Sequence, residues 1–188
     1  MQATMQITRA NMAVAAGATS SPAGFALERI FTEHKDLVFR AAYRVTGNAG
    51  DAEDVLQVVF LRLLRQERPP EITHMRAYLH RAAVNAALDL IRLRKDAHIP
   101  LEDPAVTAET AVAGGQIAGE LREWLRQALA RLNPRWAEMF VLRFVEGYSN
   151  GEIAAMMKTS AAVVAVLLHR SRAQLKKDYM AVTKGRRQ

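Results

Sequence analysis

Basic side chains and one asparagine recur between residues 73 and 95 at a spacing that suits contact with nucleic acid. Arg81, Asn85, Arg92 and Lys95 lie at i, i+4, i+11 and i+14, which is a single stripe of a helix. Arginine and lysine bind phosphates, and asparagine can hold an unpaired base. A solvated helix face is the other interpretation. Asp89 is the only acid of the segment, however, and this imbalance favours a nucleic-acid partner.

A second segment, from Asp51 to Leu64, combines an acidic start with two different helix faces. One face is an apolar stripe that we expect to pack into a core, made of Ala52, Val55, Leu56, Val59, Phe60, Leu63 and Leu64. The other face mixes acidic, amide and apolar groups in Asp54, Gln57, Val58 and Leu61, a mixture that suits a protein partner. An ordinary amphipathic helix, whose acids complement its dipole, remains the alternative.

The residues that could support catalysis or metal binding lack the necessary spacing. The histidines, which are His34, His74, His80, His98 and His169, show no metal-ligand pattern, and no glycine-rich phosphate loop is present. Capping accounts for the carboxylates at the helix start near residue 51 without a reaction. We therefore expect a protein that is not an enzyme and that needs no metal or cofactor.

The bulk composition limits the class of protein further. The chain has 188 residues, 50% of them hydrophobic and 6% aromatic, which suits small helical cores of leucine, valine, alanine and methionine. A net charge of +7 favours a polyanionic partner. The absence of cysteine fits a reducing cytoplasm. No apolar run is long enough to span a bilayer, and residues 1–24 lack the pattern of a signal peptide.

Turn signals divide the chain into helices, and the fold class that they predict is all-α. Ser21, Thr73, Asn133, Ser149 and Ser160 are candidate N-caps. Residues 96–120 contain no lysine or arginine and carry several prolines and glycines, so they are expected to form an acidic, mostly irregular linker between two small helical domains. The predicted organisation is a disordered tail (1–24), a helical domain (25–95), the linker (96–120), a second helical domain (121–178) and a basic tail (179–188).

The second domain contains a candidate helix-turn-helix. A short helix after Ser149 is followed by a turn at Thr159 and Ser160, and then by a helix over 161–177 that carries His169, Arg170 and Arg172. In that motif the start of the second helix reaches base edges in the major groove. A plain helical hairpin with a solvated basic end is the alternative interpretation.

Taken together, four segments over residues 25–178 resemble the extracytoplasmic-function (ECF) class of bacterial sigma factors. The segments are Asp51-Ala52-Glu53-Asp54-Val55-Leu56-Gln57, Arg76-Ala77-Tyr78-Leu79-His80-Arg81-Ala82-Ala83-Val84-Asn85, Leu132-Asn133-Pro134-Arg135 through Glu146-Gly147-Tyr148-Ser149, and Glu152-Ile153-Ala154 with Leu168-His169-Arg170-Ser171-Arg172. Their order and spacing, rather than any one of them, carry the likeness.

The resemblance implies partners and site residues. The partners would be core RNA polymerase, through its β′ clamp and β flap, and promoter DNA, with no cofactor and no membrane insertion. The sequence leaves open whether an anti-sigma factor is a further partner. Binding to core polymerase would use Asp51, Glu53, Asp54, Gln57, Phe60 and Leu61. The −10 element would be bound by the loop 67–74 and by Arg76, His80, Arg81, Asn85 and Arg92. The −35 element would be bound by Ser160, Ala162, Val163, Ala165, Val166, His169, Arg170 and Arg172.

The chain departs from the family pattern at several of these positions. Tyr78 stands where tryptophan is usual, and Val58 replaces an acid beside Gln57. Lys158 stands at the usual turn glycine, a position that needs a left-handed backbone. The recognition helix is apolar over residues 162–167, and alanine and valine can touch a thymine methyl group but cannot form bidentate hydrogen bonds with bases.

The function that these features favour is that of a sigma factor that recognises −10 and −35 elements and promotes DNA melting. Two other functions stay open. A sigma-like decoy would keep the protein-binding helix but lack promoter function, and a stand-alone helix-turn-helix regulator would use residues 25–95 to dimerise. The sequence does not specify the promoter, the regulon, the activating signal or the role of residues 1–24.

Overall fold

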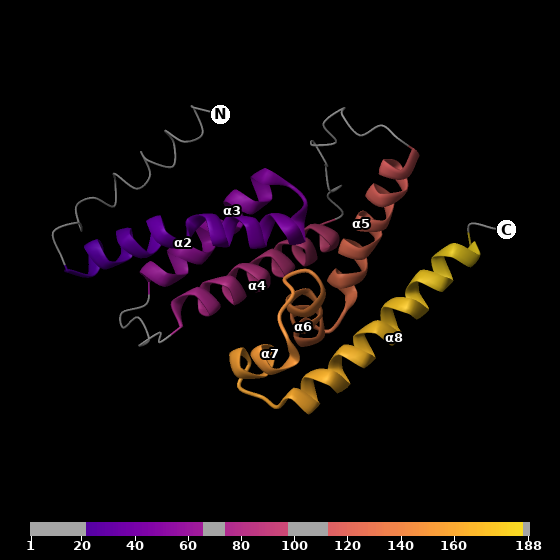
Figure 1. Ribbon diagram of the computed structural model, residues 1–188. Helices are drawn as coiled ribbons and strands as arrows, with labels where there is room; N and C mark the ends of the chain where they lie inside the picture. Colours follow the sequence, from indigo (N-terminus) through magenta and orange to yellow (C-terminus); the bar gives the residue numbers. More distant parts are fainter. Residues whose placement is uncertain (1–21, 66–73, 98–112, 186–188) are drawn as a thin grey trace. The chain divides into compact units, whose positions relative to one another are not determined.

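The computed structural model describes residues 22–65, 74–97 and 113–185, and Figure 1 gives the labels of its elements. The described residues form only helices, joined by turns. The helices are α2 (Pro22–Thr46), α3 (Ala49–Leu64), α4 (Met75–Asp96), α5 (Ala113–Arg131), α6 (Pro134–Phe144), α7 (Asn150–Met156) and α8 (Ala161–Gly185). The all-α prediction is therefore confirmed.

Contacts between Cα atoms divide the chain into two units, Met1–Asp36 and Leu37–Gln188, and α2 belongs to both. Every contact discussed below lies within the second unit. The predicted division into domains at residues 95 and 121 stays a prediction.

Side-chain caps explain where several helices begin. The Asn48 side chain accepts a hydrogen bond from the backbone N–H of Asp51 at the start of α3, and Asn133 does the same for Arg135 at the start of α6. Ser149 and Glu152 form the predicted capping box of α7. The Ser160 hydroxyl accepts from the Val163 N–H at 3.2 Å, which caps α8. The predicted caps Ser21 and Thr73 lie outside the described residues.

The apolar stripes read from the sequence build the core of the second unit. The most deeply buried large side chains include Leu79, Leu88 and Ile91 of α4 and Met139 and Leu142 of α6. In α3 the stripe is buried at Ala52, Val55, Val59, Phe60 and Leu63. Leu64 was expected in this stripe but is 52% exposed, because α3 ends at that residue and leaves no further turn to cover it.

Two helices extend beyond the predicted limits. Helix α5 begins at Ala113, inside the segment expected to be an irregular linker, so Gly114 and Gly115 do not prevent a helix there. Helix α8 continues to Gly185, through most of the predicted basic tail. Its end is held by an edge-to-face contact between Tyr179 and Trp124 of α5, whose ring centroids lie 5.0 Å apart. A contact between residues so distant in sequence leaves no local signal.

The helix-turn-helix is present in α7 and α8, whose axes are bent by 106° at the turn (Figure 1). Lys158 in this turn has φ +50°, which confirms the left-handed backbone predicted at its position. In the described residues no single helix is both long and apolar enough to cross a membrane, although α7 and α8 pass that test together as a bent pair, by length and composition only.

The strained backbone at Lys158 yields a stability prediction. Lys158→Gly should raise the free energy of unfolding by about 0.5–1 kcal/mol, because glycine removes the left-handed penalty of about 1–2 kcal/mol while adding chain entropy to the unfolded state. Urea unfolding measures the change. Lys158→Ala is the control, since it removes the lysine side chain but keeps the strain. Equal stability of the glycine and alanine variants would contradict the account.

Candidate nucleic-acid interface

Helix α4 carries the residues expected to meet DNA because its opposite face is fixed in the core. Leu79, Ala83 and Leu88 are completely buried, and this anchors the helix. Arg76 is exposed, Arg81 and Asn85 are partly exposed, and His80 is buried. The structure therefore places the predicted −10 residues along one helix but leaves them unequally accessible.

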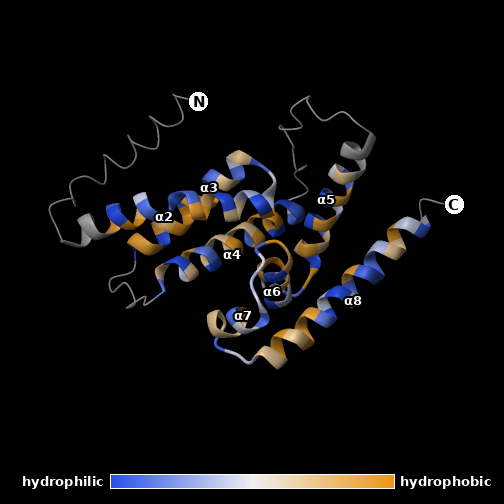
Figure 2. Cartoon of the chain, in the orientation of Figure 1, coloured by the Kyte–Doolittle hydropathy of each residue, from blue (hydrophilic) through white to orange (hydrophobic). Residues whose placement is uncertain are grey.

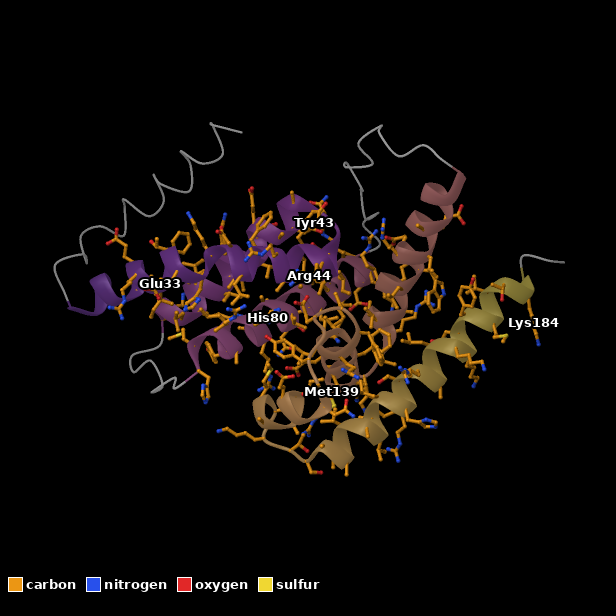
Figure 3. The ribbon with its side chains drawn as sticks, in the orientation of Figure 1. Glu33, Tyr43, Arg44, His80, Met139 and Lys184 are labelled. Atoms are coloured by element: carbon orange, nitrogen blue, oxygen red, sulfur yellow. The ribbon has the colours of Figure 1, made fainter. Side chains whose placement is uncertain are left out.

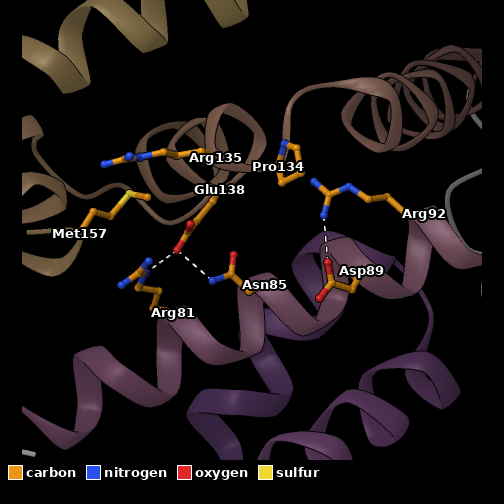
Figure 4. A pocket seen from close by; sticks show the side chains of 8 residues that line it. All are labelled: Arg81, Asn85, Asp89, Arg92, Pro134, Arg135, Glu138 and Met157. Carbon is orange, nitrogen blue, oxygen red and sulfur yellow. Dashed lines mark hydrogen bonds and ion pairs between the residues drawn. The ribbon is translucent and has the colours of Figure 1, made fainter. Parts of the chain in front are cut away.

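Arg81 and Asn85 converge on Glu138 of α6 (Figure 4). Arg81 donates its Nε–H to Glu138 Oε1 in an ion pair, and Asn85 Nδ2 donates to the same oxygen at 2.9 Å. Arg81 Nη1 also donates to the Met156 carbonyl at 3.0 Å. The side chain of Glu138 is only 7% exposed. The two polar heads expected to hold DNA are thus bound to a buried carboxylate.

A second buried carboxylate, Glu146, follows α6 and binds two basic residues (labelled Arg44 and His80 in Figure 3). Arg44 donates to both of its oxygens, at 2.9 and 2.6 Å, and His80 Nε2 lies 2.6 Å from Oε2. The other ring nitrogen of His80 lies 2.5 Å from the Tyr148 hydroxyl. Burial acts to raise the pKa of Glu146, but the hydrogen bonds from His80 and Arg44 outweigh it and hold that pKa below its ordinary value.

Arg92 lies farther along α4, beside an open cavity of about 570 Å³ (Figure 4). Its Nη1 donates to Asp89 at 3.0 Å. Its Nε and Nη2 are buried and have no hydrogen-bond partner among the described residues. Arg135 and Pro134 of α6 also line this cavity, so the packing between α4 and α6 is incomplete here.

The expected polymerase-binding surface on α3 divides into exposed and buried members. Asp54, Gln57 and Leu61 are exposed, and Glu53 is partly exposed. Asp51 and Phe60 are buried instead, at 2% and 8% exposure. Those two side chains therefore pack inside the protein. The accessible part of the expected polymerase-binding surface consists of Glu53, Asp54, Gln57 and Leu61.

Asp51 is buried because it meets Arg94 of α4, with which it forms an ion pair. Burial raises the pKa of Asp51, and the positive charge of Arg94 opposes that rise. The second carboxylate oxygen, Oδ2, has no hydrogen-bond partner among the described residues. The pair links α3 to α4 and explains why an acid of the predicted docking surface points inward.

The eight residues expected to bind the −35 element are all exposed on α8 or its cap. The first turns of the helix are hydrophobic at the surface (Figure 2), and Val163 and Val166 are 42% and 50% exposed. Arg172 lies over the Phe144 ring of α6, with its guanidinium carbon 4.4 Å from the ring centroid. The surface therefore offers methyl groups at its head and basic groups farther along.

Sequence reasoning missed the residues that bind the α4 face, namely Glu138, Glu146 and Tyr148, and it missed Arg44, which pairs with Glu146. One signal was available at Glu138. It shares a helical stripe with Val141 and Leu142 at i+3 and i+4, both of which are completely buried, so an acid there had to be buried and paired. Nothing in the local pattern identifies Arg81 as its partner, which lies 57 positions earlier. Among the described residues no cluster of histidine, cysteine or acidic groups could hold a metal ion.

An all-α chain with a helix-turn-helix and a further helix, α4, that carries four arginines has the features of a DNA-binding protein. Residues 30–97 match the family Sigma-70 region 2, and residues 122–175 match Sigma-70, region 4. The chain belongs to the sigma-70 family of RNA polymerase sigma factors, in its ECF class. Members of this family are transcription initiation factors rather than enzymes.

Several curated proteins are similar over most of the chain. RNA polymerase sigma factor CarQ of Myxococcus xanthus is 34% identical over 154 residues, which is 80% of this chain and 87% of CarQ. ECF RNA polymerase sigma factor SigE of Mycolicibacterium smegmatis is 32% identical over 82% of this chain, which spans 61% of the length of SigE. Among solved structures, CnrH in complex with the cytosolic domain of CnrY is 27% identical, with a TM-score of 0.47 over 89% of this chain and 95% of that one.

The buried pair between α3 and α4 gives a prediction with a defined pH dependence. Arg94→Met should destabilise the protein by about 2 kcal/mol, because Asp51 then stays buried without a counter-charge. Without Arg94 the pKa of Asp51 rises further, so the folded state binds the proton more tightly than the unfolded state does. The deficit relative to the parent should therefore shrink as the pH falls from 7 towards that raised pKa.

Thermal unfolding at several pH values measures this deficit. The double variant Asp51→Asn with Arg94→Met is the control, since it has no carboxylate at position 51 to titrate and its deficit relative to the parent should not shrink as the pH falls. A deficit of Arg94→Met that is independent of pH would contradict the role given to Asp51.

Proposed function

We propose that this chain acts as the promoter-recognition subunit of RNA polymerase and that it works only when bound to the core enzyme, in the cytoplasm. The exposed residues Asp54, Gln57 and Leu61 of α3 dock on the polymerase clamp. Their combination of acid, amide and apolar groups fits a protein surface. The observation that carries the proposal is that the segment matching Sigma-70 region 2 gathers four arginines and an asparagine along one helix, α4, and that one of the four, Arg94, pairs with Asp51.

Capture by α4 explains how such a protein could open DNA without an energy source. Arg76, Arg81 and Arg92 bind the phosphates of the non-template strand, and Asn85 holds an unpaired base. Stacking and hydrogen bonding to a flipped base offset an unstacking cost of about a few kcal/mol. The loop 67–74, expected to share this task, lies outside the described residues except for His74.

The helix-turn-helix binds the −35 element as duplex. Its exposed Val163 and Val166 meet thymine methyl groups, while His169, Arg170 and Arg172 hold the backbone. Recognition then depends on DNA shape and on AT-rich sequence more than on bidentate hydrogen bonds. The same apolar head motivates one second candidate, a decoy that binds core polymerase without starting transcription.

Transcription in vitro separates these functions. With purified core polymerase and a pool of genomic fragments from the source organism, the parent protein should start transcription at specific sites, and Arg81→Ala with Asn85→Ala should abolish it. Arg131→Ala with Gln127→Ala is the matched control, since both residues are exposed on α5 and the charge change is equal. Tight core binding without initiation would indicate the decoy, and no core binding would leave the stand-alone regulator.

The apolar recognition helix gives a separate prediction. Ala165→Lys with Val166→Arg should bind duplex DNA more tightly and steepen the fall of affinity with salt, because two added cations release about two more counterions. Both positions are exposed, whereas Leu167 beside them is half-buried and is left unchanged. Fluorescence anisotropy at several salt concentrations measures the slope, and an unchanged slope would show that this face does not approach the duplex.

A further inference from the structure

Several side chains that the proposed function assigns to DNA are already bound to carboxylates of the same chain. Glu138 accepts from Arg81 and Asn85, and Glu146 accepts from His80 and Arg44. A carboxylate presents to these donors the same kind of anionic oxygen that a DNA phosphate presents. Each acid therefore competes directly with DNA for the same side chains.

Burial makes these contacts essential to the arrangement of α4, α6 and α7. The side chain of Glu146 is 1% exposed and that of Glu138 is 7% exposed. A buried carboxylate is tolerated only when it is paired and hydrogen-bonded. The carboxylates thus need the basic residues of α4 and α2 for as long as the helices stay together.

Other features keep the arrangement reversible. Once the helices separate, both carboxylates regain water, which offsets much of the loss of the ion pairs. Beside the Arg81–Glu138 contact lies the cavity of about 570 Å³, where Arg92 keeps two unsatisfied nitrogens. Atoms that line such a space lose packing contacts on one side, so separation forfeits little packing energy there.

We propose that Glu138 and Glu146 form an internal latch that mimics DNA and keeps the α4 face closed until α6 and α7 move away from α4. The proposal rests on the proposed function, because it is the strand-binding face of α4 that the latch covers. In the closed state the chain withholds Arg81, Asn85 and His80 from single-stranded DNA. Binding of core polymerase or of promoter DNA then has to compete with the latch.

Two variants weaken the latch, one by removing its carboxylates and the other by removing a basic partner. Glu138→Gln with Glu146→Gln removes both acids, and Glu28→Gln with Glu33→Gln is its control, with the same charge change at exposed positions of α2. Arg44→Gln acts from the other side by removing a partner of Glu146, and Arg44 is not among the residues proposed to bind DNA. Arg44→Gln also lowers the net charge, so a non-specific electrostatic effect would weaken DNA binding rather than strengthen it.

The full-length free protein is tested against a fluorescein-labelled, degenerate single-stranded 12-mer. Both latch variants should bind it about tenfold more tightly than the parent, because apparent affinity scales with the fraction of molecules that are open. The gain should vanish when Arg81→Ala and Asn85→Ala are added. Since the chain has no cysteine, spin labels on Leu93→Cys of α4 and Lys177→Cys of α8 report opening directly, as a longer and broader distance distribution in both latch variants.

Unchanged distances in both variants would overturn the latch, and so would opening without any gain in DNA binding. Thermal unfolding of each variant establishes that it is folded, and Arg44→Gln provides the test if the double glutamine variant is not. Transcription by the holoenzyme distinguishes the two proposals. If Arg81→Ala with Asn85→Ala abolishes initiation while the latch variants change neither distance nor affinity, the proposed function stands and the latch is wrong.

Discussion

A carboxylate removed from water must be paired, and in this protein that constraint links the two segments that match sigma regions 2 and 4. Glu138 and Glu146 belong to the second segment, and the partners that satisfy them are supplied mostly by α4 in the first. The position of α4 against α6 and α7, the accessibility of Arg81 and the burial of His80 all depend on these pairs. The acids also set the competition that DNA must win.

The charge distribution distinguishes the two helices that are proposed to contact DNA. The chain carries a net charge of +7, yet the buried Glu138 and Glu146 pair with basic side chains that would otherwise be free to bind an anion. The exposed surface of α8 keeps its cations uncovered apart from Arg172, which lies over Phe144. The cations of α8 are therefore accessible to duplex DNA, whereas Arg81, Asn85 and His80 of α4 are paired with Glu138 and Glu146. This difference suits a factor that finds a promoter before it opens one.

The sequence predicts much of this fold because many determinants are local. The caps at Asn133 and Ser149, the left-handed turn at Lys158 and the apolar stripes of α3 follow from neighbouring residues. The burial of Asp51 and the pairing of Arg81 do not, because their partners lie 43 and 57 positions away, respectively. A helical stripe indicates which side of α4 is polar, but it does not indicate whether DNA, water or a distant carboxylate meets that side.

The most direct test of the central claim is a double-mutant cycle between Arg81 and Glu138. The free energy of unfolding is measured for the parent, Arg81→Ala, Glu138→Gln and the double variant. The account predicts that the two changes are not additive and that the coupling energy is about 0.5–3 kcal/mol in favour of the pair. Additive effects, with a coupling energy of zero within error, would show that the contact contributes nothing to the folded chain and would contradict the account.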